Sequence, residues 1–188
     1  MLCWHLMQNG LGLGDAIRQA SFNGVSIITG TGYVSANFSA WGGFATTILL
    51  IVMFIGGCGG STTCGIKVFR LQVLVSTVKV QISRLLRPHA VVLAYYNTRP
   101  VSGEVMDSVM GFFYLYILGF VVIALFLGIT GLDFVTALSG AATSISNVGP
   151  GLGEVIGAEG NFSSVPDSAK WVMSFAMILG RLEIFTVL

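Results

Sequence analysis

Residues 144–153 read SISNVGPGLG, and this stretch decides how the chain is to be interpreted. Polar residues, three glycines and a proline interrupt a segment that carries no charge from Phe134 to Gly153. A second stretch of the same kind, ITGTGYVS, occupies residues 28–35 inside another uncharged segment. The backbone N–H and C=O groups of such a glycine-rich stretch need hydrogen-bond partners that a regular helix would otherwise supply. The structural role of the stretch therefore depends on the environment of the segments that flank it.

The composition indicates a lipid environment. The chain of 188 residues is 54% hydrophobic and 9% charged, against about 25% charged residues in an ordinary soluble domain. No charged side chain occurs in residues 19–66 or in residues 108–132. A helix that spans a bilayer needs about 20 such residues. Because lipid-exposed backbone must satisfy its own hydrogen bonds, we expect an all-α polytopic membrane protein.

The charges also predict an orientation. Six of the nine Lys and Arg residues fall in residues 67–99, so the positive-inside rule places that segment in the cytoplasm. The acidic residues that follow the apolar run 108–132 indicate an outward-facing side: Asp133, Glu154, Glu159 and Asp167.

Two predicted helices are too short to cross the membrane. The segments 15–28 and 133–145 are helix-compatible, and at about 1.5 Å per residue each covers about 20 Å of a core about 30 Å thick. Both stop at glycine-rich stretches, residues 29–33 and 146–151. We therefore expect two re-entrant pore helices, each followed by a loop that returns toward the same side.

Longer helices flank these re-entrant segments. We expect a broken helix over 41–87 interrupted by GGCGGSTTCG at residues 56–65, a helix over 104–130 and a last helix over 170–188. A connector, residues 88–100, and an outer loop, residues 154–169, join them. The second half of the broken helix has a basic amphipathic pattern suited to the headgroup region.

The chain shows the same order of elements twice: a helix, a short helix, a glycine-rich loop and a second helix. This order predicts two related units, residues 1–100 and 101–188, of which the first lacks most of its first helix. Matching Gly32 to Gly149 aligns VSIITGTGY with ATSISNVGP. In this alignment Asp15 and Asp133, which lead the two segments, are out of register by one residue, the slack that the comparison requires. Irregular backbone at membrane depth is tolerated where it lines a cavity. Main-chain carbonyls in such loops can replace the hydration shell of a monovalent cation, and the negative end of each short helix points to the same place.

Other interpretations of the glycine-rich segments are weaker. GLGLG and GPGLG resemble phosphate-binding loops, but neither follows a predicted soluble strand. GSTTCGIK, residues 60–67, resembles a Walker loop, but Lys67 is one position late and Val68 replaces the required Ser or Thr. We therefore expect neither an enzyme nor a bound cofactor. A secondary transporter of a small solute, with residues 56–65 as an unwound binding site, stays open, as does a membrane scaffold.

Three motifs carry a resemblance to a known family: MFIGGCGGSTTCGIKVFRL, ISNVGPGLGEV and ILGRLEIFTVL. Together they resemble the C-terminal part of the Trk/Ktr superfamily of potassium transporters, most closely the Trk-type pore subunit. The resemblance implies potassium-channel-like units of helix, pore helix, filter loop and helix, of which this chain holds the third and fourth. It assigns the potassium-binding filter positions Gly30, Thr31, Gly32, Asn147, Val148 and Gly149.

Two further roles are expected near these loops. The break at residues 56–65 falls past the midplane on the cytoplasmic side, and its glycines suggest a mobile gate: Gly56, Gly57, Gly59, Gly60 and Gly65. Arg181 lies about 16 Å down a helix that enters from outside, close to the membrane centre. A lipid-facing guanidinium would be costly there, so we expect Arg181 to face the pore as an electrostatic barrier, with a buried ion pair to another helix as the alternative.

The resemblance also implies partners and a location. Members of the family form homodimers in the bacterial inner membrane, with a cytosolic nucleotide-binding regulatory ring beneath. The basic segment 67–99 is a candidate docking surface for that ring, and attraction to anionic lipid is the alternative. No nucleic-acid partner is expected. We also expect these residues to be a fragment of a longer protein, because two filter loops cannot enclose an ion.

Overall fold

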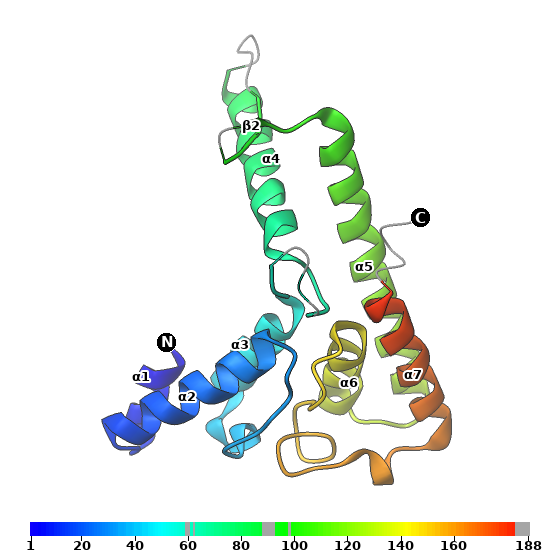
Figure 1. Cartoon of the computed structure of the whole chain (residues 1–188). Helices are drawn as coiled ribbons and strands as arrows, with labels where there is room; N and C mark the ends of the chain where they lie inside the picture. The colour runs from blue at the N-terminus through cyan, green and yellow to red at the C-terminus, as the bar shows by residue number, and fades with distance from the viewer. Residues whose placement is uncertain (59–60, 62, 88–92, 98, 183–188) are drawn as a thin grey trace.

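The computed structural model describes residues 1–58, 61, 63–87, 93–97 and 99–182. Within these ranges the chain forms seven α-helices, two short 3-10 helices and one small hairpin (Figure 1). The α-helices are α1 (Leu2–Gln8), α2 (Leu13–Ile28), α3 (Gly43–Phe54), α4 (Val68–Leu86), α5 (Gly103–Ile129), α6 (Phe134–Ser146) and α7 (Asp167–Arg181). The remaining elements are η1 (Phe38–Trp41), η2 (Phe162–Ser164), β1 (Tyr95–Tyr96) and β2 (Arg99–Pro100), with β1 and β2 paired antiparallel.

α5 is the one helix of the described ranges that is long and apolar enough to cross a membrane. Its 27 residues cover about 40 Å at 1.5 Å per residue. It runs from the β1–β2 hairpin and the end of α4 to the turn before α6, which lie at opposite ends of the molecule (Figure 1). The basic residues of α4 and the acidic residues that follow α5 are therefore separated along the length of α5.

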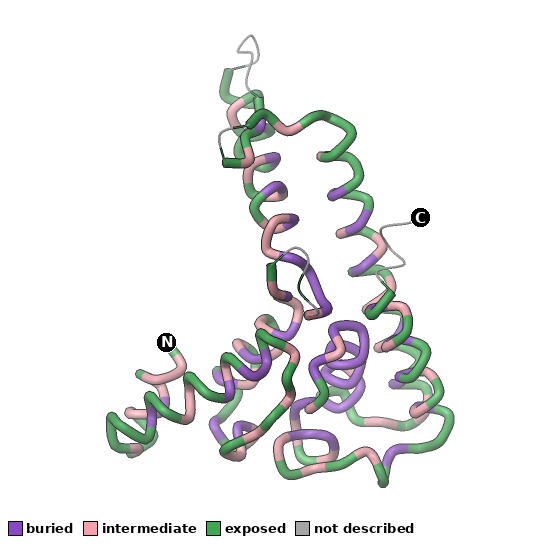
Figure 2. The backbone as a smooth tube through the Cα atoms, in the orientation of Figure 1, coloured by how far each residue is buried: buried purple, intermediate pink, exposed green. Residues whose placement is uncertain are grey.

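α6 is the central element of the fold. Ten of its 13 residues are buried, and it is the most continuously buried helix in Figure 2. One apolar cluster joins α6 to α5 and α7 through residues such as Ala141, Ile145 and Met173. A second cluster joins α6 and its following loop to α1, α2 and α3 through Ala142, Val148 and other residues. The loop after α6 is thus held between both halves of the chain.

The ends of α6 are fixed by side chains with specific conformational preferences. Asp133 is the N-cap, and its carboxylate accepts a hydrogen bond from the Thr136 backbone N–H at 3.1 Å. A hydrogen bond from the Thr136 side chain is the main cause that lowers the pKa of Asp133. At the other end Asn147 adopts the left-handed conformation, with φ 51° and ψ 44°, which Asn tolerates better than most residues. The chain therefore leaves the helix at this residue.

The expected broken helix is two helices, α3 and α4, with their ends joined by backbone pairing. Ile55 and Ile66 form a parallel bridge, in which Gly56 N–H donates to the Ile66 carbonyl and Ile66 N–H donates to the Phe54 carbonyl, both at 2.9 Å. The segment between them leaves this bridge and returns to it. The break is thus a loop whose two ends are held together by backbone hydrogen bonds.

Several boundaries differ from those expected from the sequence. α2 begins two residues earlier than the expected 15–28, and α6 is shifted by one residue from 133–145. α7 begins at Asp167, inside the expected outer loop 154–169, because Pro166 takes the N-cap position, where a missing N–H costs nothing. Part of the connector 88–100 and residues 183–188 of the last helix lie outside the described residues.

Candidate functional site

The two glycine-rich loops, residues 29–33 and 146–151, are termed the filter loops here. They have the same backbone hydrogen-bond pattern. Thr31 N–H donates to the Ser26 carbonyl at 3.0 Å, and Val148 N–H donates to the Thr143 carbonyl at 3.1 Å. In each case the donor lies five residues after the acceptor. The two donors are 117 positions apart in the sequence, and so are the two acceptors.

The flanking bonds follow the same offset. Gly30 N–H donates to Ile27 and Asn147 N–H donates to Ser144, at 3.1 and 3.3 Å. The next glycine in each loop returns to the residue that already accepts: Gly32 N–H to the Ser26 carbonyl at 3.4 Å, and Gly149 N–H to the Thr143 hydroxyl at 3.0 Å. The match of Gly32 to Gly149 made from the sequence thus has a counterpart in the hydrogen bonding.

The backbone dihedrals repeat as well. Gly30 and Asn147 have φ of 66° and 51°, and Gly32 and Gly149 have φ of 76° and 112°. Positive φ is readily reached by glycine and is tolerated by asparagine. This requirement explains why one loop has Gly where the other has Asn.

Buried polar side chains hold the segment that follows each filter loop. The Asn23 amide accepts from Ser35 N–H at 3.1 Å and donates to the Ser35 hydroxyl at 3.0 Å. In the second unit the Ser139 hydroxyl accepts from Leu152 N–H at 3.0 Å and donates to the Leu152 carbonyl at 3.2 Å. Ser35 and Leu152 are again 117 positions apart, whereas Asn23 and Ser139 differ by one residue from that offset. This shift has the opposite sign to the one between Asp15 and Asp133, which are 118 positions apart, so it does not account for the slack expected from the sequence.

The two filter loops lie against each other. A Cβ added to Gly32 would lie 2.6 Å from the Val148 carbonyl oxygen and 3.2 Å from the Pro150 ring. A Cβ added to Gly30 would lie 3.5 Å from the Asn147 carbonyl oxygen. Loops 117 residues apart in sequence therefore meet at their glycines.

The backbone N–H groups and the carbonyl oxygens of these loops differ in their hydrogen bonding. The six N–H groups of residues 30–32 and 147–149 donate to the preceding helices. The carbonyl oxygens of the same six residues accept no hydrogen bond from any part of the chain that the structure describes. Carbonyl oxygens without such partners can coordinate a dehydrated cation, and the hydrogen bonds of the neighbouring N–H groups hold the backbone in place.

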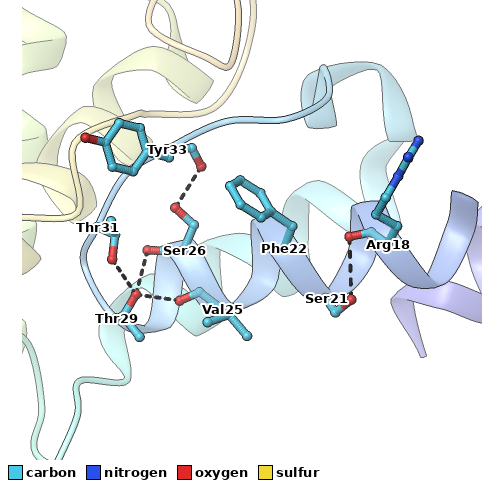
Figure 3. A pocket seen from close by; sticks show the side chains of 8 residues that line it. All are labelled: Arg18, Ser21, Phe22, Val25, Ser26, Thr29, Thr31 and Tyr33. Carbon is cyan, nitrogen blue, oxygen red and sulfur yellow. Dashed lines mark hydrogen bonds between the residues drawn. The ribbon is translucent and has the colours of Figure 1, made fainter.

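One side of the first filter loop is open. A groove of about 510 Å³ runs along α2 and reaches Thr31 and Tyr33 (Figure 3). The Thr29 hydroxyl pairs with the Thr31 hydroxyl at 2.7 Å, and the Ser26 hydroxyl donates to the Tyr33 carbonyl at 2.7 Å. The hydroxyls thus fix the loop from the side of the groove, while the exposed Phe22 and Val25 make its wall apolar.

The 56–65 loop, expected from the sequence to be a gate, lies next to the first filter loop. The Thr63 hydroxyl donates to the Thr29 carbonyl at 3.4 Å, and the Thr63 methyl would lie 3.8 Å from a Cβ on Gly30. Gly65 has φ of 84°, and a side chain at Gly56 would overlap the Cys64 carbonyl. Gly57 is enclosed by the Ser61 and Thr63 side chains. Gly59 and Gly60 lie outside the described residues.

Arg181 lies at the end of α7, and its guanidinium donates to the Cys64 sulfur at 3.6 Å. The preceding Gly180 packs directly on the Ile145 carbonyl at the end of α6. The Asn147 side chain donates to the Met177 carbonyl at 3.0 Å. α7 is therefore fixed to the second filter loop, and Arg181 reaches from it to the 56–65 loop.

Sequence reasoning missed four residues that support the site. Gly180 was not identified, and Asn23 and Ser139 gave no periodic or motif signal. Lys67 was treated as one of the basic residues of the cytoplasmic segment, yet it is 5% exposed and lies beside the 56–65 loop. Its place directly after a run of 48 uncharged residues was the available signal.

Among the residues that the structure describes, no group of three or more His, Cys, Asp or Glu side chains could hold a metal ion.

Comparisons with known proteins identify the family. Residues 7–188 match the TrkH family model, described as a cation transport protein. The chain is 44% identical over 185 residues to the Trk system potassium uptake protein TrkI of Halomonas elongata, covering 98% of this chain and 37% of that protein. It is also 44% identical over 174 residues to TrkH of Vibrio parahaemolyticus, covering 93% of this chain and 35% of that protein. The chain thus spans a little over a third of these relatives.

A solved structure shares the fold. The crystal structure of the potassium transporter TrkH from Vibrio parahaemolyticus matches with a TM-score of 0.90 and 40% identity, over 99% of this chain and 40% of that one. The predicted fold class, an all-α polytopic membrane protein with potassium-channel-like units, is confirmed. The small-solute transporter is not favoured, since these relatives are named as potassium uptake proteins. The chain belongs to the TrkH family of cation transport proteins.

Proposed function

We propose that this chain contributes two filter units to a protein that moves potassium ions across the cytoplasmic membrane. The observation that carries the proposal is that the two filter loops lie against each other. The N–H groups of residues 30–32 and 147–149 donate to the preceding helices, and the carbonyls of these residues accept no hydrogen bond from the part of the chain that the structure describes. Such carbonyls favour a dehydrated cation over an anion or a solute. The printed names of the relatives, potassium uptake proteins, favour potassium as that cation.

The two units supply part of the coordination shell. The family resemblance implies four such units around one pore, and this chain spans 37% of its relative from Halomonas elongata. Residues 1–100 and 101–188 are proposed as the third and fourth units, with Gly30, Thr31 and Gly32 opposite Asn147, Val148 and Gly149. The open groove along α2 is where a further unit would complete the ring.

The 56–65 loop is proposed as the gate of this pore. Its ends are pinned by the bridge between Ile55 and Ile66, while Thr63 reaches the start of the first filter loop. A loop with fixed ends can move without disturbing α3 or α4. Arg181, which contacts the same loop through Cys64, is proposed as an electrostatic barrier to cations beside it.

The partners and location follow from the family and the charge distribution. We propose a multi-pass homodimer in the bacterial inner membrane, with a cytosolic nucleotide-binding regulatory subunit. The basic residues Arg84 and Arg99, near the end of the molecule opposite the acidic turn at Asp133, are proposed as part of its docking surface. Attraction of the same residues to anionic lipid is the competing explanation. Transport requires no covalent chemistry, so no catalytic residue is proposed.

Ion flux into liposomes that contain the complete transporter tests the proposal. Potassium and rubidium, which are similar in size, should enter much faster than sodium when each is supplied as the driving gradient. Equal entry of potassium and sodium would contradict a selective filter at these loops. Absence of ion entry, with uptake of an organic solute, would instead support the small-solute transporter.

A further inference from the structure

Tyr116 lies near the middle of α5 and is buried. Only 2% of its surface is exposed, and a tyrosine hydroxyl removed from water needs a hydrogen-bond partner. Its hydroxyl is hydrogen-bonded to the Ser146 hydroxyl, with the two oxygens 2.8 Å apart. Ser146 is the last residue of α6 and the first residue of the second filter loop. α5 therefore contacts the second filter unit at the point where the pore helix ends.

The ring of Tyr116 is held by other aromatic side chains. It stacks on Phe112, one turn earlier in α5, with ring centroids 5.6 Å apart and planes inclined by 29°. Phe54, the last residue of α3, meets the same ring edge-on at 6.3 Å. Stacked and edge-to-face contacts of this kind stabilise a defined ring orientation. The hydroxyl is therefore held toward Ser146 by a ring that is packed against two helices.

The first filter loop is braced in a different way. Thr29 lies 117 positions before Ser146, and its hydroxyl is hydrogen-bonded at 2.7 Å to the hydroxyl of Thr31 in the same loop (Figure 3). The position of Thr31 is occupied by Val148 in the second loop. Valine has no hydroxyl, so Ser146 cannot form the equivalent pair within its own loop. The Tyr116 hydroxyl supplies from α5 the partner that the second loop lacks.

This hydrogen bond lies next to the residues proposed to bind the ion. Asn147, which follows Ser146, has the left-handed backbone conformation that turns the chain out of α6, and its side chain donates to the Met177 carbonyl of α7 at 3.0 Å. The start of the second filter loop is thus held from α7 by Asn147 and from α5 by Tyr116. Since Ser146 is 2% exposed, loss of the Tyr116 hydroxyl would leave a buried hydroxyl without this partner, which is unfavourable.

We propose that Tyr116 is a positioning residue for potassium selectivity. Through Ser146 it fixes the start of the second filter loop, and so the spacing at which the carbonyls of residues 147–149 face the ion. The inference rests on the proposed function and adds to it a residue outside the filter loops. Tyr116 acts through Ser146 and does not contact the permeating ion.

The test compares Tyr116→Phe with the unmodified complete transporter in liposomes, with potassium and sodium flux measured on each. Phenylalanine keeps the ring and its contacts with Phe112 and Phe54 and removes only the hydroxyl. Loss of one buried hydrogen bond shifts the balance between two conformations by about threefold to tenfold, and we expect the ratio of potassium to sodium flux to fall by a similar factor. A residue that only supported folding would lower both fluxes together and leave the ratio unchanged. An unchanged ratio would therefore overturn the proposal.

Two further variants make the result specific. Tyr114→Phe is the matched control: it removes a hydroxyl from the same helix at a residue that is 68% exposed, and it should leave the flux ratio unchanged. Ser146→Ala removes the other member of the hydrogen bond and should lower the ratio as Tyr116→Phe does. If Tyr116→Phe does not give folded protein, Ser146→Ala carries the test, and a ratio equal to that of the unmodified protein would overturn the proposal.

The double variant shows whether the two residues act together. If Tyr116 works through Ser146, Tyr116→Phe combined with Ser146→Ala should lower the flux ratio no further than either change alone. Losses that multiply would mean that the residues act separately, which would overturn the proposal. The unmodified protein separates this inference from the proposed function. If it admits potassium and sodium equally, the proposed filter fails and the role of Tyr116 fails with it, whereas a selective protein that Tyr116→Phe leaves selective overturns the role of Tyr116 alone.

Discussion

At the scale of single residues, the glycines of the filter loops differ in what a side chain would meet. Gly30, Gly32 and Gly149 all have positive φ, which costs an L-residue about 1 to 2 kcal/mol. Only Gly32 would also bring a Cβ within 2.6 Å of a backbone atom, the Val148 carbonyl oxygen. At Gly149 the nearest atom would be 3.7 Å away, on Gly32. The strictest requirement for glycine is therefore at the point where the loops meet.

Gly32→Ala should reduce selectivity more than Gly30→Ala. The added methyl at Gly32 must displace the Val148 carbonyl, which is a proposed ion ligand, whereas at Gly30 the nearest carbonyl oxygen would be 3.5 Å away. We expect the ratio of potassium to sodium flux to fall by about tenfold for Gly32→Ala and by a smaller factor for Gly30→Ala. The measurement is paired flux assays on both variants, after size-exclusion chromatography shows each to be folded. An equal loss of potassium selectivity in the two variants would contradict a close contact between the loops at Gly32.

The sequence predicted these positions because they depend on local conformation. Glycines at Gly32 and Gly149 reflect a backbone requirement, so comparing the two stretches aligned them correctly. The anchors Asn23 and Ser139 were not predicted, because their partners at Ser35 and Leu152 become neighbours only when the chain folds back. A buried polar side chain shows no pattern in sequence that would reveal such a partner.

At the scale of elements, the close crossing of α6 and α7 positions the second filter loop. Gly180 allows α7 to lie directly on the Ile145 carbonyl, and Asn147 then reaches the Met177 carbonyl. The short helix α6 is buried on both sides, so it cannot move to relieve a change in α7. Helices such as α3 and α6 were predictable from charge-free runs and glycine stops, but this crossing was not, since it depends on one glycine that breaks no pattern.

Gly180→Ala should destabilise the transporter and disturb the second filter loop. The methyl would overlap the Ile145 carbonyl, and overpacking of this kind typically costs about 1 to 3 kcal/mol. We expect a lower melting temperature and a reduced preference for potassium. Gly111→Ala on α5 is the matched control, because a Cβ there meets nothing within 4 Å in this chain and alanine favours helix. Thermal unfolding in detergent compares the two, and an unchanged melting temperature for Gly180→Ala would rule out the tight crossing.

At the scale of the whole molecule, elements distant in sequence converge on the 56–65 loop. Lys67 approaches it from the start of α4 and Arg181 from the end of α7, 114 positions later in the chain. The first filter loop contacts the same region through the hydrogen bond from Thr63 to Thr29. Two cationic side chains therefore border the loop beneath a site proposed to bind cations. The sequence indicated Arg181 from its depth in the membrane, but the convergence with Lys67 depends on the fold.

Arg181→Gln should increase potassium flux without loss of folded protein. Glutamine removes the positive charge of Arg181 but keeps a polar side chain that can still donate a hydrogen bond, as the guanidinium does to the Cys64 sulfur. A unit charge about 8 Å from a passing cation contributes about 2 kcal/mol at an effective dielectric constant of about 20. That energy corresponds to roughly thirtyfold in rate, and because water in the pore screens part of it, we expect an increase of about threefold to thirtyfold. Liposome flux of potassium measures the change.

Arg181→Lys distinguishes the charge from the shape of the side chain. Lysine keeps the positive charge but not the planar guanidinium, so under the barrier proposal its flux should stay close to that of the unmodified protein. If Arg181 instead supports an ion pair with another helix, Arg181→Gln should unfold the protein or leave flux unchanged, because removing one partner of a buried pair is strongly destabilising. A flux that rises equally in Arg181→Lys and Arg181→Gln would point to loosening of the 56–65 loop through the lost Cys64 contact.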